Sequence, residues 1–452
     1  MLLHADQALL PEGWVRDVTV EVLAGRIAAV GPANPAAKMG DIKVDVLLPA
    51  PVNLHSHSFQ RAMAGLTEYR SAGQDNFWTW RSLMYRFLHQ LGPDDVEAIA
   101  AQVMVEMAEA GYGAITEFHY LHHGLGGVSY SDRAEMAGRI CAASQATGLG
   151  LTLLPVLYEQ GGCDGRALTG GQLRFGNDLD GFSKLMAGAE RHLGQLPADA
   201  VLGLAPHSLR AVSAASLAMA EAMQAGPIHI HVAEQVAEVD EVLAFTGQRP
   251  VDWLLSHAPV DQRWCLIHAT QMVAAETRAL AASGAVAGLC PITEANLGDG
   301  IFDAASYLAF GGRFGIGSDS NVRISLSEEI RILEYSQRLG LKARAVLADE
   351  RSVGRVIFEA MTKGGAQAGG RDSGAIAVGK WADLVALDCS GPDLAGRRGD
   401  RVLDTFAFAG DDRMVQHLWS AGRHIVQDGR HVARGAVRAR FGRVMARLAE
   451  AV

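Results

Sequence analysis

The middle of the chain alternates between apolar runs and stretches with helical spacing. Val96–Ala110 and Ser216–Gln224 are rich in Ala and Glu and repeat their apolar residues as a helix does. Between such stretches, near-continuous runs of Val, Ile and Leu are typical of strands in a parallel sheet that is covered on both faces. There are eight such runs, at 46–55, 114–118, 150–157, 201–205, 228–233, 264–268, 285–290 and 313–317. Eight strands with intervening helices predict an α/β fold with a closed (β/α)₈ TIM-like barrel rather than an open sheet.

The two ends of the chain carry an antiparallel β pattern instead. Val18–Val22 alternates apolar and polar positions, and Arg26–Gly31 follows Gly25 as a second short strand. Near the other end, Ala382–Leu387 reads as a strand, and His424–Val426 with the GRHV stretch after Gly429 reads as a hairpin. We therefore expect a small β-sandwich domain built from both chain ends. The predicted division is 1–48 and 373–435 for the β domain, 49–372 for the barrel, and 436–452 for a closing helix.

The composition narrows the class of protein. The 452 residues include 40 Lys and Arg against 50 Asp and Glu, a net charge of -10, and 49% are hydrophobic. An acidic globular chain without a Lys/Arg block argues against a nucleic-acid or membrane-surface partner. Because no apolar stretch approaches about 18 residues and no basic segment opens the chain, we expect neither a membrane span nor a signal peptide. Five scattered cysteines without a CxxC pair suit a reduced cytoplasm.

Polar residues gather where the predicted strands end. His55 and His57 lie two apart on the first barrel strand, so both imidazoles face the same side. Such a pair is weak evidence alone, because a chain with 16 histidines produces it by chance, and His229 with His231 is a second case. Barrel enzymes, however, build their sites at the carboxyl ends of strands. The polar strand ends are Glu117–Tyr120, Pro206–Arg210, His231–Glu234, His268–Thr270 and Gly317–Ser320.

The candidate metal ligands are His55, His57, His231 and Asp319. Three imidazoles and one carboxylate suit one divalent transition ion, with Zn²⁺ expected first and Fe²⁺ second, and a water in a further position. A two-metal barrel hydrolase typically bridges its ions with a modified lysine at the end of the fourth strand. The lysines stand only at 38, 43, 184, 342, 363 and 380, so one metal is the better prediction.

Two further residues are candidate proton carriers. Glu234 lies three residues after His231 and could transfer protons beside the metal, although an acid at a helix N-terminus is the alternative interpretation. His268 is either a fifth ligand or a free base and electrostatic clamp, and we favour the second; Asp319 would act as both ligand and base. We expect His229 to be a core residue, and His122 with His123 to be surface groups.

The motifs together resemble those of the amidohydrolase superfamily over nearly the whole chain. Within it, the HVAE run and the lysine-free fourth strand are similar to the mononuclear deaminase branch. The closest resemblance is to the formimidoylglutamate deiminase family of histidine degradation. It rests on the runs PVNLHSHSFQRAMAGLTE, NFWTWRSLMYR, TEFHYLHH, APHSLRAV, CPITEANLGDGIF and FGIGSDSNVRISLSEEIR. The resemblance implies hydrolysis of N-formimidoyl-L-glutamate to N-formyl-L-glutamate and ammonia by a homodimer. Gln271-Met272 departs from the His-Leu of other members and should not touch the ligands.

A dicarboxylate substrate needs cationic and polar groups at the mouth of the barrel. The sequence offers Gln60, Arg81, Tyr120, His207 and Arg210 there, and arginine forks match carboxylates in a bidentate way. The alternative for Arg81, in a Trp-rich loop, is a surface or dimer contact.

Two other functions stay open. One is an aminohydrolase for a purine, pterin or triazine-like heterocycle; the other is a metal-free scaffold, which would be expected to have lost ligands.

Overall fold

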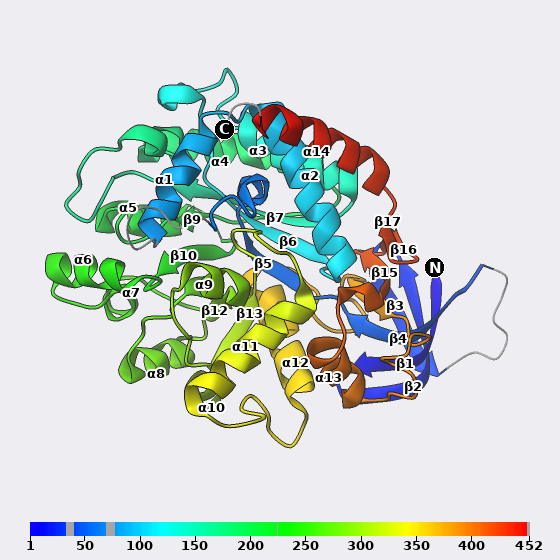
Figure 1. Ribbon diagram of the computed structural model, residues 1–452. Coiled ribbons are helices and arrows are strands. Elements are labelled where there is room, and N and C mark those ends of the chain that lie inside the picture. The colour runs from blue at the N-terminus through cyan, green and yellow to red at the C-terminus, as the bar shows by residue number, and fades with distance from the viewer. Residues whose placement is uncertain (33–39, 69–76, 224, 450–452) are drawn as a thin grey trace.

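The computed structural model describes residues 1–32, 40–68, 77–223 and 225–449, except the side chains of residues 77–79 and 82. Lys38, Gln224, the side chain of Trp78 and the last three residues of the predicted closing helix fall outside that description. Figure 1 shows helices arranged around a set of parallel strands, with a second sheet at the right, beside the N-terminus. Among the described residues, no helix is long and apolar enough to cross a membrane.

The parallel strands form two sheets, in the orders β5-β6-β7-β8 and β10-β11-β12-β13, and β9 also pairs with β7. Their bounds are β5 (Val52–Ser56), β6 (Ala114–His119), β7 (Gly150–Leu157), β8 (Val201–Leu202), β9 (Ala205–Pro206), β10 (Ile228–Val232), β11 (Trp264–His268), β12 (Val286–Leu289) and β13 (Arg313–Ile316). Every residue of β6, β7, β10 and β11 is buried, which explains why these strands read as continuous apolar runs.

Two of the predicted strands are divided in the structure. The run at 46–55 contributes to both sheet systems, because its first part belongs to β4 (Ile42–Pro49) and its second part is β5. The run at 201–205 is interrupted at Gly203, where Leu204 pairs with Ile228 of β10. A Cβ atom at Gly203 would lie 2.5 Å from the backbone oxygen of Pro227, so this close passage requires glycine.

Helices cover the parallel strands, as the alternating pattern predicts (Figure 1). The α-helices are α1 (Phe77–Leu88), α2 (Pro93–Ala110), α3 (Glu135–Thr147), α4 (Leu179–Leu193), α5 (Ala214–Ala222), α6 (Val236–Thr246), α7 (Pro250–His257), α8 (Ala274–Ser283), α9 (Pro291–Leu297), α10 (Ala304–Ala309), α11 (Leu326–Leu341), α12 (Val353–Ala368), α13 (Asp400–Phe408) and α14 (Arg434–Ala449). Short 3₁₀ helices are η1 (Ser58–Met63), η2 (Leu125–Gly127), η3 (Gly170–Arg174) and η4 (Asp412–Met414). The Trp-rich segment before Arg81 is the start of α1, so its interpretation as a loop was wrong.

The second sheet is mixed and comes from both ends of the chain. Its order is β17-β16-β15-β14-β4-β1-β2-β3, with β4 parallel to β1 and antiparallel to β14. The bounds not yet given are β1 (Leu2–Leu10), β2 (Gly13–Leu23), β3 (Arg26–Pro32), β14 (Leu384–Leu387), β15 (Val415–Ser420), β16 (Arg423–Gln427) and β17 (Arg430–His431). The prediction named a sandwich, but these strands form one continuous sheet, because β4 joins the N-terminal and C-terminal strands edge to edge.

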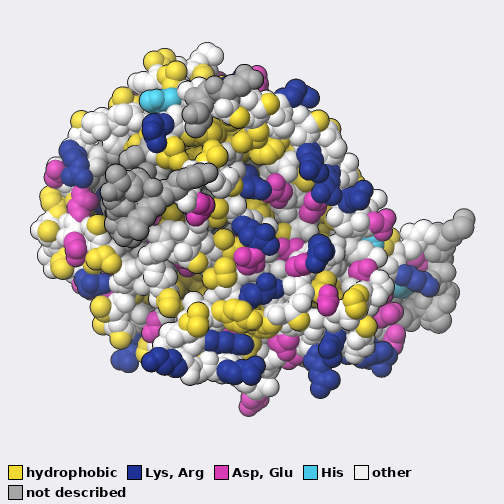
Figure 2. All heavy atoms as spheres, viewed as in Figure 1, with side chains coloured by type: hydrophobic (Ala, Val, Ile, Leu, Met, Phe, Trp, Pro, Cys, Tyr) yellow, Lys and Arg dark blue, Asp and Glu magenta, His cyan; other side chains and the backbone are white. Residues whose placement is uncertain are grey.

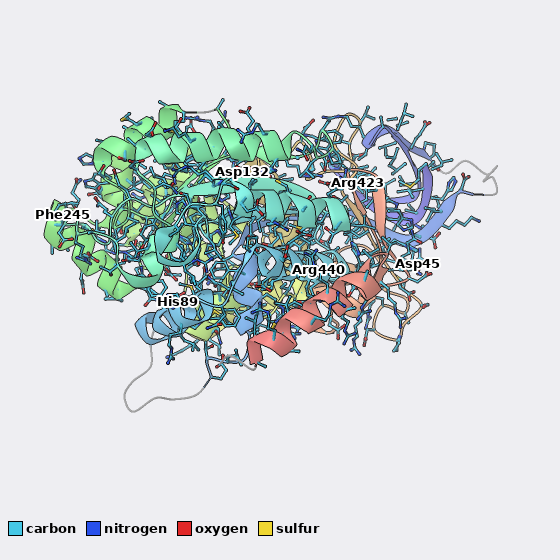
Figure 3. The ribbon with its side chains drawn as sticks, turned by 90° about the horizontal axis from the view of Figure 1, so that it is seen from above. Asp45, His89, Asp132, Phe245, Arg423 and Arg440 are labelled. Carbon is cyan, nitrogen blue, oxygen red and sulfur yellow. The ribbon has the colours of Figure 1, made fainter. Side chains whose placement is uncertain are left out.

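A buried ion network ties the mixed sheet to the parallel strands. The fully buried Arg371, after α12, donates from Nε to Asp383 Oδ2 at 2.6 Å and from Nη2 to Asp199 Oδ2 at 2.8 Å. Arg423 of β16, labelled in Figure 3, donates to the same Asp199 carboxylate at 2.7 Å. Asp199 precedes β8 and Asp383 precedes β14, so the network connects the two sheet systems.

On the face of the molecule shown in Figure 2, Lys and Arg side chains are interspersed with Asp and Glu.

Candidate metal centre and substrate cavity

The polar ends of the parallel strands meet in one buried cluster. One ligand atom each from His55, His231, His268 and Asp319 lies within 4.8 Å of all the others. The Nε2 atoms of His55 and His57 both lie 3.3 Å from Asp319 Oδ1. The Nε2 atoms of His55 and His231 are 3.1 Å apart. The structure therefore brings the four predicted ligands together, and it adds His268 to the same group.

Hydrogen bonds to backbone carbonyls orient two of these imidazoles. His57 Nδ1 donates to Phe118 O at 3.0 Å, and His231 Nδ1 donates to His207 O at 3.1 Å. A proton on Nδ1 leaves Nε2 of each ring with a lone pair that can bind a metal, as in metal-binding histidines. Burial lowers the pKa of His55, His57 and His231, which favours the neutral form that binds a metal. Neutral imidazole nitrogens converging on one carboxylate oxygen are a donor set that fits a divalent transition ion.

The backbone is strained at the turns that carry these side chains. Ala233, His268 and Asp319 have φ values of 52°, 68° and 46°, in the left-handed region that non-glycine residues rarely adopt. The Asp319 turn is fixed by backbone bonds, since Asp319 N donates to His55 O and His57 N donates to Asp319 O, both at 2.9 Å. Asn321 Nδ2 also donates to Ser56 Oγ at 3.1 Å. Strain of this kind clusters at functional sites.

Carboxylates surround His268. Its Nε2 lies 3.7 Å from Glu234 Oε1 and 3.8 Å from Asp319 Oδ2, and its Nδ1 lies 3.3 Å from Glu294 Oε1. Burial alone would lower the pKa of His268, but these carboxylates outweigh it and raise the pKa well above its ordinary value. Burial raises the pKa of Glu234 to about 7. Glu238, not Glu234, accepts the backbone N–H groups of residues 233 and 234 that precede α6, which weakens the helix-terminus interpretation of Glu234.

Sequence reasoning missed two acidic residues of this cluster. Glu294 belongs to α9, and its Oε1 accepts Cys290 N at 2.8 Å as well as facing His268. Asp299 follows α9 and lies within 4.8 Å of Glu234 and His268. Both residues belong to the CPITEANLGDGIF run, whose polar residues after a predicted strand were the available signal.

A cavity opens beside the cluster, with His57, Glu234 and Asp319 in its wall. All five predicted substrate-binding residues line it, so Arg81 faces the cavity rather than the outer surface. Gln60 Nε2 donates to Tyr120 OH at 2.7 Å, which fixes two of them against each other. The lining residues are His57, Gln60, Trp80, Arg81, Met84, Tyr85, Tyr120, Tyr158, Phe175, His207, Arg210, His231, Glu234, His268, Leu297, Asp319 and Ser320.

Two other histidine predictions had opposite outcomes. His122 and His123 are buried, not on the surface as expected, because their backbone N–H groups bond to Arg174 O and their Nε2 atoms donate to backbone carbonyls at 2.9 Å. His229 is a core residue as predicted, with Nε2 donating to Ala368 O at 2.8 Å.

The side chain of Gln271 bonds to the backbone carbonyl of Asp299, not to a predicted ligand.

Comparisons with known proteins agree with this geometry. A family model described as the amidohydrolase family matches residues 46–425, and one described as the N-terminal domain of formimidoylglutamate deiminase HutF matches residues 1–43. The chain is 49% identical over 434 residues to the formimidoylglutamate deiminase of Pseudomonas aeruginosa, covering 94% of each chain. The crystal structure of an amidohydrolase from Brucella melitensis shares 46% identity with a TM-score of 0.95, covering 99% of both chains. An adenosine deaminase from Xanthomonas campestris, solved with bound zinc, shares the fold at 22% identity, with a TM-score of 0.80 over 99% of this chain and 98% of that one.

Proposed function

Because the chain belongs to the amidohydrolase family and to its formimidoylglutamate deiminase branch, we propose that it hydrolyses N-formimidoyl-L-glutamate to N-formyl-L-glutamate and ammonia in histidine degradation. The observation that carries the proposal is the cavity, in which Arg81 and Arg210 lie in the same lining as Glu234, His268 and Asp319. A small dicarboxylate with a hydrolysable C–N bond needs both kinds of group.

The proposal includes a closed (β/α)₈ barrel over 49–372 that presents the site at one end. Isolated parallel bridges support closure at both junctions of the two parallel sheets, Ser56 with Asp319 on one side and Leu204 with Ile228 on the other. A closed barrel would bring all eight strand ends to one mouth. The segments 1–48 and 373–435 would then form the small β domain, and 436–452 the closing helix.

The proposed cofactor is one divalent ion, Zn²⁺ or else Fe²⁺, held by His55, His57, His231 and Asp319. The donor set of neutral imidazoles and one carboxylate supports it. When bound, the ion would lower the pKa of a water and stabilise negative charge beside it.

The chain's own residues would move the protons of the reaction. Asp319 would take the proton of the attacking water, with His268 Nε2 beside it, 3.8 Å from Asp319 Oδ2. Glu234 would donate a hydrogen bond to the formimidoyl nitrogen and deliver protons to it, so that this nitrogen leaves as ammonia. His268 would also stabilise the charge that develops at the attacked carbon.

Substrate orientation would fall to Gln60, Arg81, Tyr120, His207 and Arg210, which line the cavity together. The two guanidinium groups favour a dicarboxylate over the competing class of neutral heterocycles, which offer no carboxylate to pair with them. The presence of all four candidate ligands and both proton carriers argues against a metal-free scaffold, which would be expected to have lost ligands.

A cytoplasmic homodimer completes the proposal. Family resemblance supports the dimer, and the five cysteines are all free, as expected in a reduced compartment.

The test is an ammonia-release assay with N-formimidoyl-L-glutamate beside N-formimidoyl-L-aspartate and guanine, each with and without added Zn²⁺. We expect turnover of the glutamate compound above the other two. Turnover of guanine without turnover of either formimidoyl compound would contradict the proposal and favour a heterocycle aminohydrolase.

A further inference from the structure

The side chain of Glu294 connects the first turns of α9 to the imidazole of His268. Its Oε1 accepts a hydrogen bond from Cys290 N at 2.8 Å and another from His268 Nδ1 at 3.3 Å. Glu294 is 5% exposed and His268 is 1% exposed, so little water reaches either group. Within the described part of the chain, Glu294 is the only hydrogen-bond partner of the His268 ring.

This hydrogen bond determines what the other nitrogen of the His268 ring faces. With Nδ1 held by Glu294, Nε2 lies on the opposite side of the ring, 3.7 Å from Glu234 Oε1 and 3.8 Å from Asp319 Oδ2. The second side-chain torsion of a histidine has broad, roughly twofold preferences, so it does not fix the ring by itself. The acceptor at one ring nitrogen also decides which nitrogen carries the proton of the neutral imidazole. Orientation of the ring therefore depends on Glu294.

The backbone around His268 also requires support from its surroundings. His268 and Ala269 have φ values of 68° and 51°, so two successive residues after the buried part of β11 lie in the left-handed region. Such a conformation persists only where surrounding contacts hold it. One of these contacts is the bond from Ala269 N to Val232 O, at 3.1 Å. It fixes the main chain, whereas the bond to Glu294 fixes the side chain.

The start of α9 is anchored on two sides, which makes it a firm support for the Glu294 carboxylate. Ile292 N donates to Glu329 Oε2 of α11 at 2.9 Å. Thr293 Oγ1 donates to Ser318 O at 3.2 Å, in the residue directly before the proposed ligand Asp319. The same helical turn thus contacts both the Asp319 turn and the His268 ring. Functional side chains need supporting contacts of this kind to stay in a productive geometry.

We propose that Glu294 is the positioning residue of His268, holding Nδ1 so that Nε2 faces Glu234 and Asp319 during the reaction. This inference rests on the proposed function and deepens it, because His268 can act beside those two carboxylates only in this orientation. Glu294 is not among the described residues that line the cavity, so it acts through His268 and not on the substrate. In the competing interpretation, Glu294 only accepts Cys290 N and stabilises the start of α9.

The first experiment measures kcat and KM of Glu294→Ala and Glu294→Gln with N-formimidoyl-L-glutamate. Glu294→Ala removes the acceptor and should lower kcat by about 10- to 100-fold, with KM within about twofold, as expected when a functional histidine loses the partner that orients it. Glu294→Gln keeps an oxygen for His268 Nδ1 and Cys290 N. It should restore kcat to within about fivefold of wild type, because an uncharged acceptor still orients the ring. An unchanged kcat in Glu294→Ala would overturn the inference.

Glu329→Ala is the matched control for the stability of α9. It removes the acceptor of Ile292 N but leaves the bond between Glu294 and His268. It should lower Tm and keep kcat within about twofold of wild type; if it does not fold, Glu329→Gln replaces it, since the amide oxygen can still accept Ile292 N. A loss of kcat equal to that of Glu294→Ala would overturn the inference, because anchoring of α9 alone would then explain both variants.

The second experiment needs no turnover, so it separates this inference from the proposed function. In Zn²⁺-loaded protein labelled with ¹⁵N-histidine, NMR should detect a downfield Nδ1–H proton of His268, identified by its absence from His268→Asn. The resonance should persist in Glu294→Gln and in the Glu329 control, and it should be lost in Glu294→Ala. A wild type without this resonance, or an unchanged resonance in Glu294→Ala, would overturn the inference. Wild-type protein that shows the predicted spectra but no turnover would refute the proposed function alone.

Discussion

Replacing Glu234 by Gln tests the proton carrier of the proposed reaction. The Glu234 side chain is 8% exposed, and its Oε1 lies 3.7 Å from His268 Nε2 in the cavity lining. Glutamine keeps the volume and can still hydrogen-bond, but it cannot give up or take a proton at neutral pH. Proton transfer by a positioned side chain contributes about 10²- to 10⁴-fold, which is about 3–5 kcal/mol of the activation barrier. We therefore expect kcat to fall by 100-fold or more while KM changes little.

The assay is steady-state ammonia release at saturating N-formimidoyl-L-glutamate, with the bound metal of each variant measured in the same preparation. Glu241→Gln is a matched control, because this carboxylate on α6 pairs with the exposed Arg166 and lies outside the cavity lining. It should retain wild-type kcat. A Glu234→Gln variant that carries its full metal content and loses less than about tenfold in kcat would refute the role of Glu234 in proton transfer.

Three further predictions concern substrate anchoring and the ion network. Arg210→Ala should raise KM by about 10- to 100-fold with a smaller effect on kcat, measured by ammonia release; an unchanged kcat/KM would show that Arg210 does not anchor the substrate. Arg371→Met should lower the free energy of unfolding by about 3–5 kcal/mol in urea titrations, because it leaves the buried Asp199 and Asp383 carboxylates without their shared partner; a loss below about 1 kcal/mol would contradict this. Burial alone would raise the pKa of Asp199, but hydrogen bonds from Arg423 and the charge of Arg371 lower it. The stability from this carboxylate is then fully present above its unfolded pKa of about 4 and is lost as the pH falls through the folded value. Asp199→Asn should therefore be less stable than wild type at pH 7 and lose less stability below pH 4, as followed by thermal melting at both pH values; an unchanged acid response would contradict the assignment.

The sequence predicted the buried strands and the residues at their ends, because both leave a pattern among neighbouring residues. Strands buried on both faces appear as apolar runs, and the ligands follow those runs, so His55, His231 and Asp319 could be found at strand ends. β1 was not identified as a strand, because it is buried on both sides at most positions and so lacks the alternation that marks an edge or surface strand.

The rest depended on contacts between residues far apart in the chain. His122 is buried because its backbone bonds to Arg174, some fifty residues later, which no local pattern records. Glu294 reaches His268 from a short helix that starts only after the next strand. The hydrogen bonds of Tyr158 to Arg81 and Gln172 likewise join three separate elements. Such contacts are set by the way the helices and loops close over the strand ends.

The central claim is that one divalent ion, held by His55, His57, His231 and Asp319, is required for hydrolysis of N-formimidoyl-L-glutamate. The most direct measurement is ammonia release by chelated protein during stepwise addition of Zn²⁺, with bound metal counted by elemental analysis at each step. The account predicts no turnover without metal and full activity at one ion per chain. Metal-free protein that turns over at the untreated rate, or activity that appears only with a second ion, would contradict it.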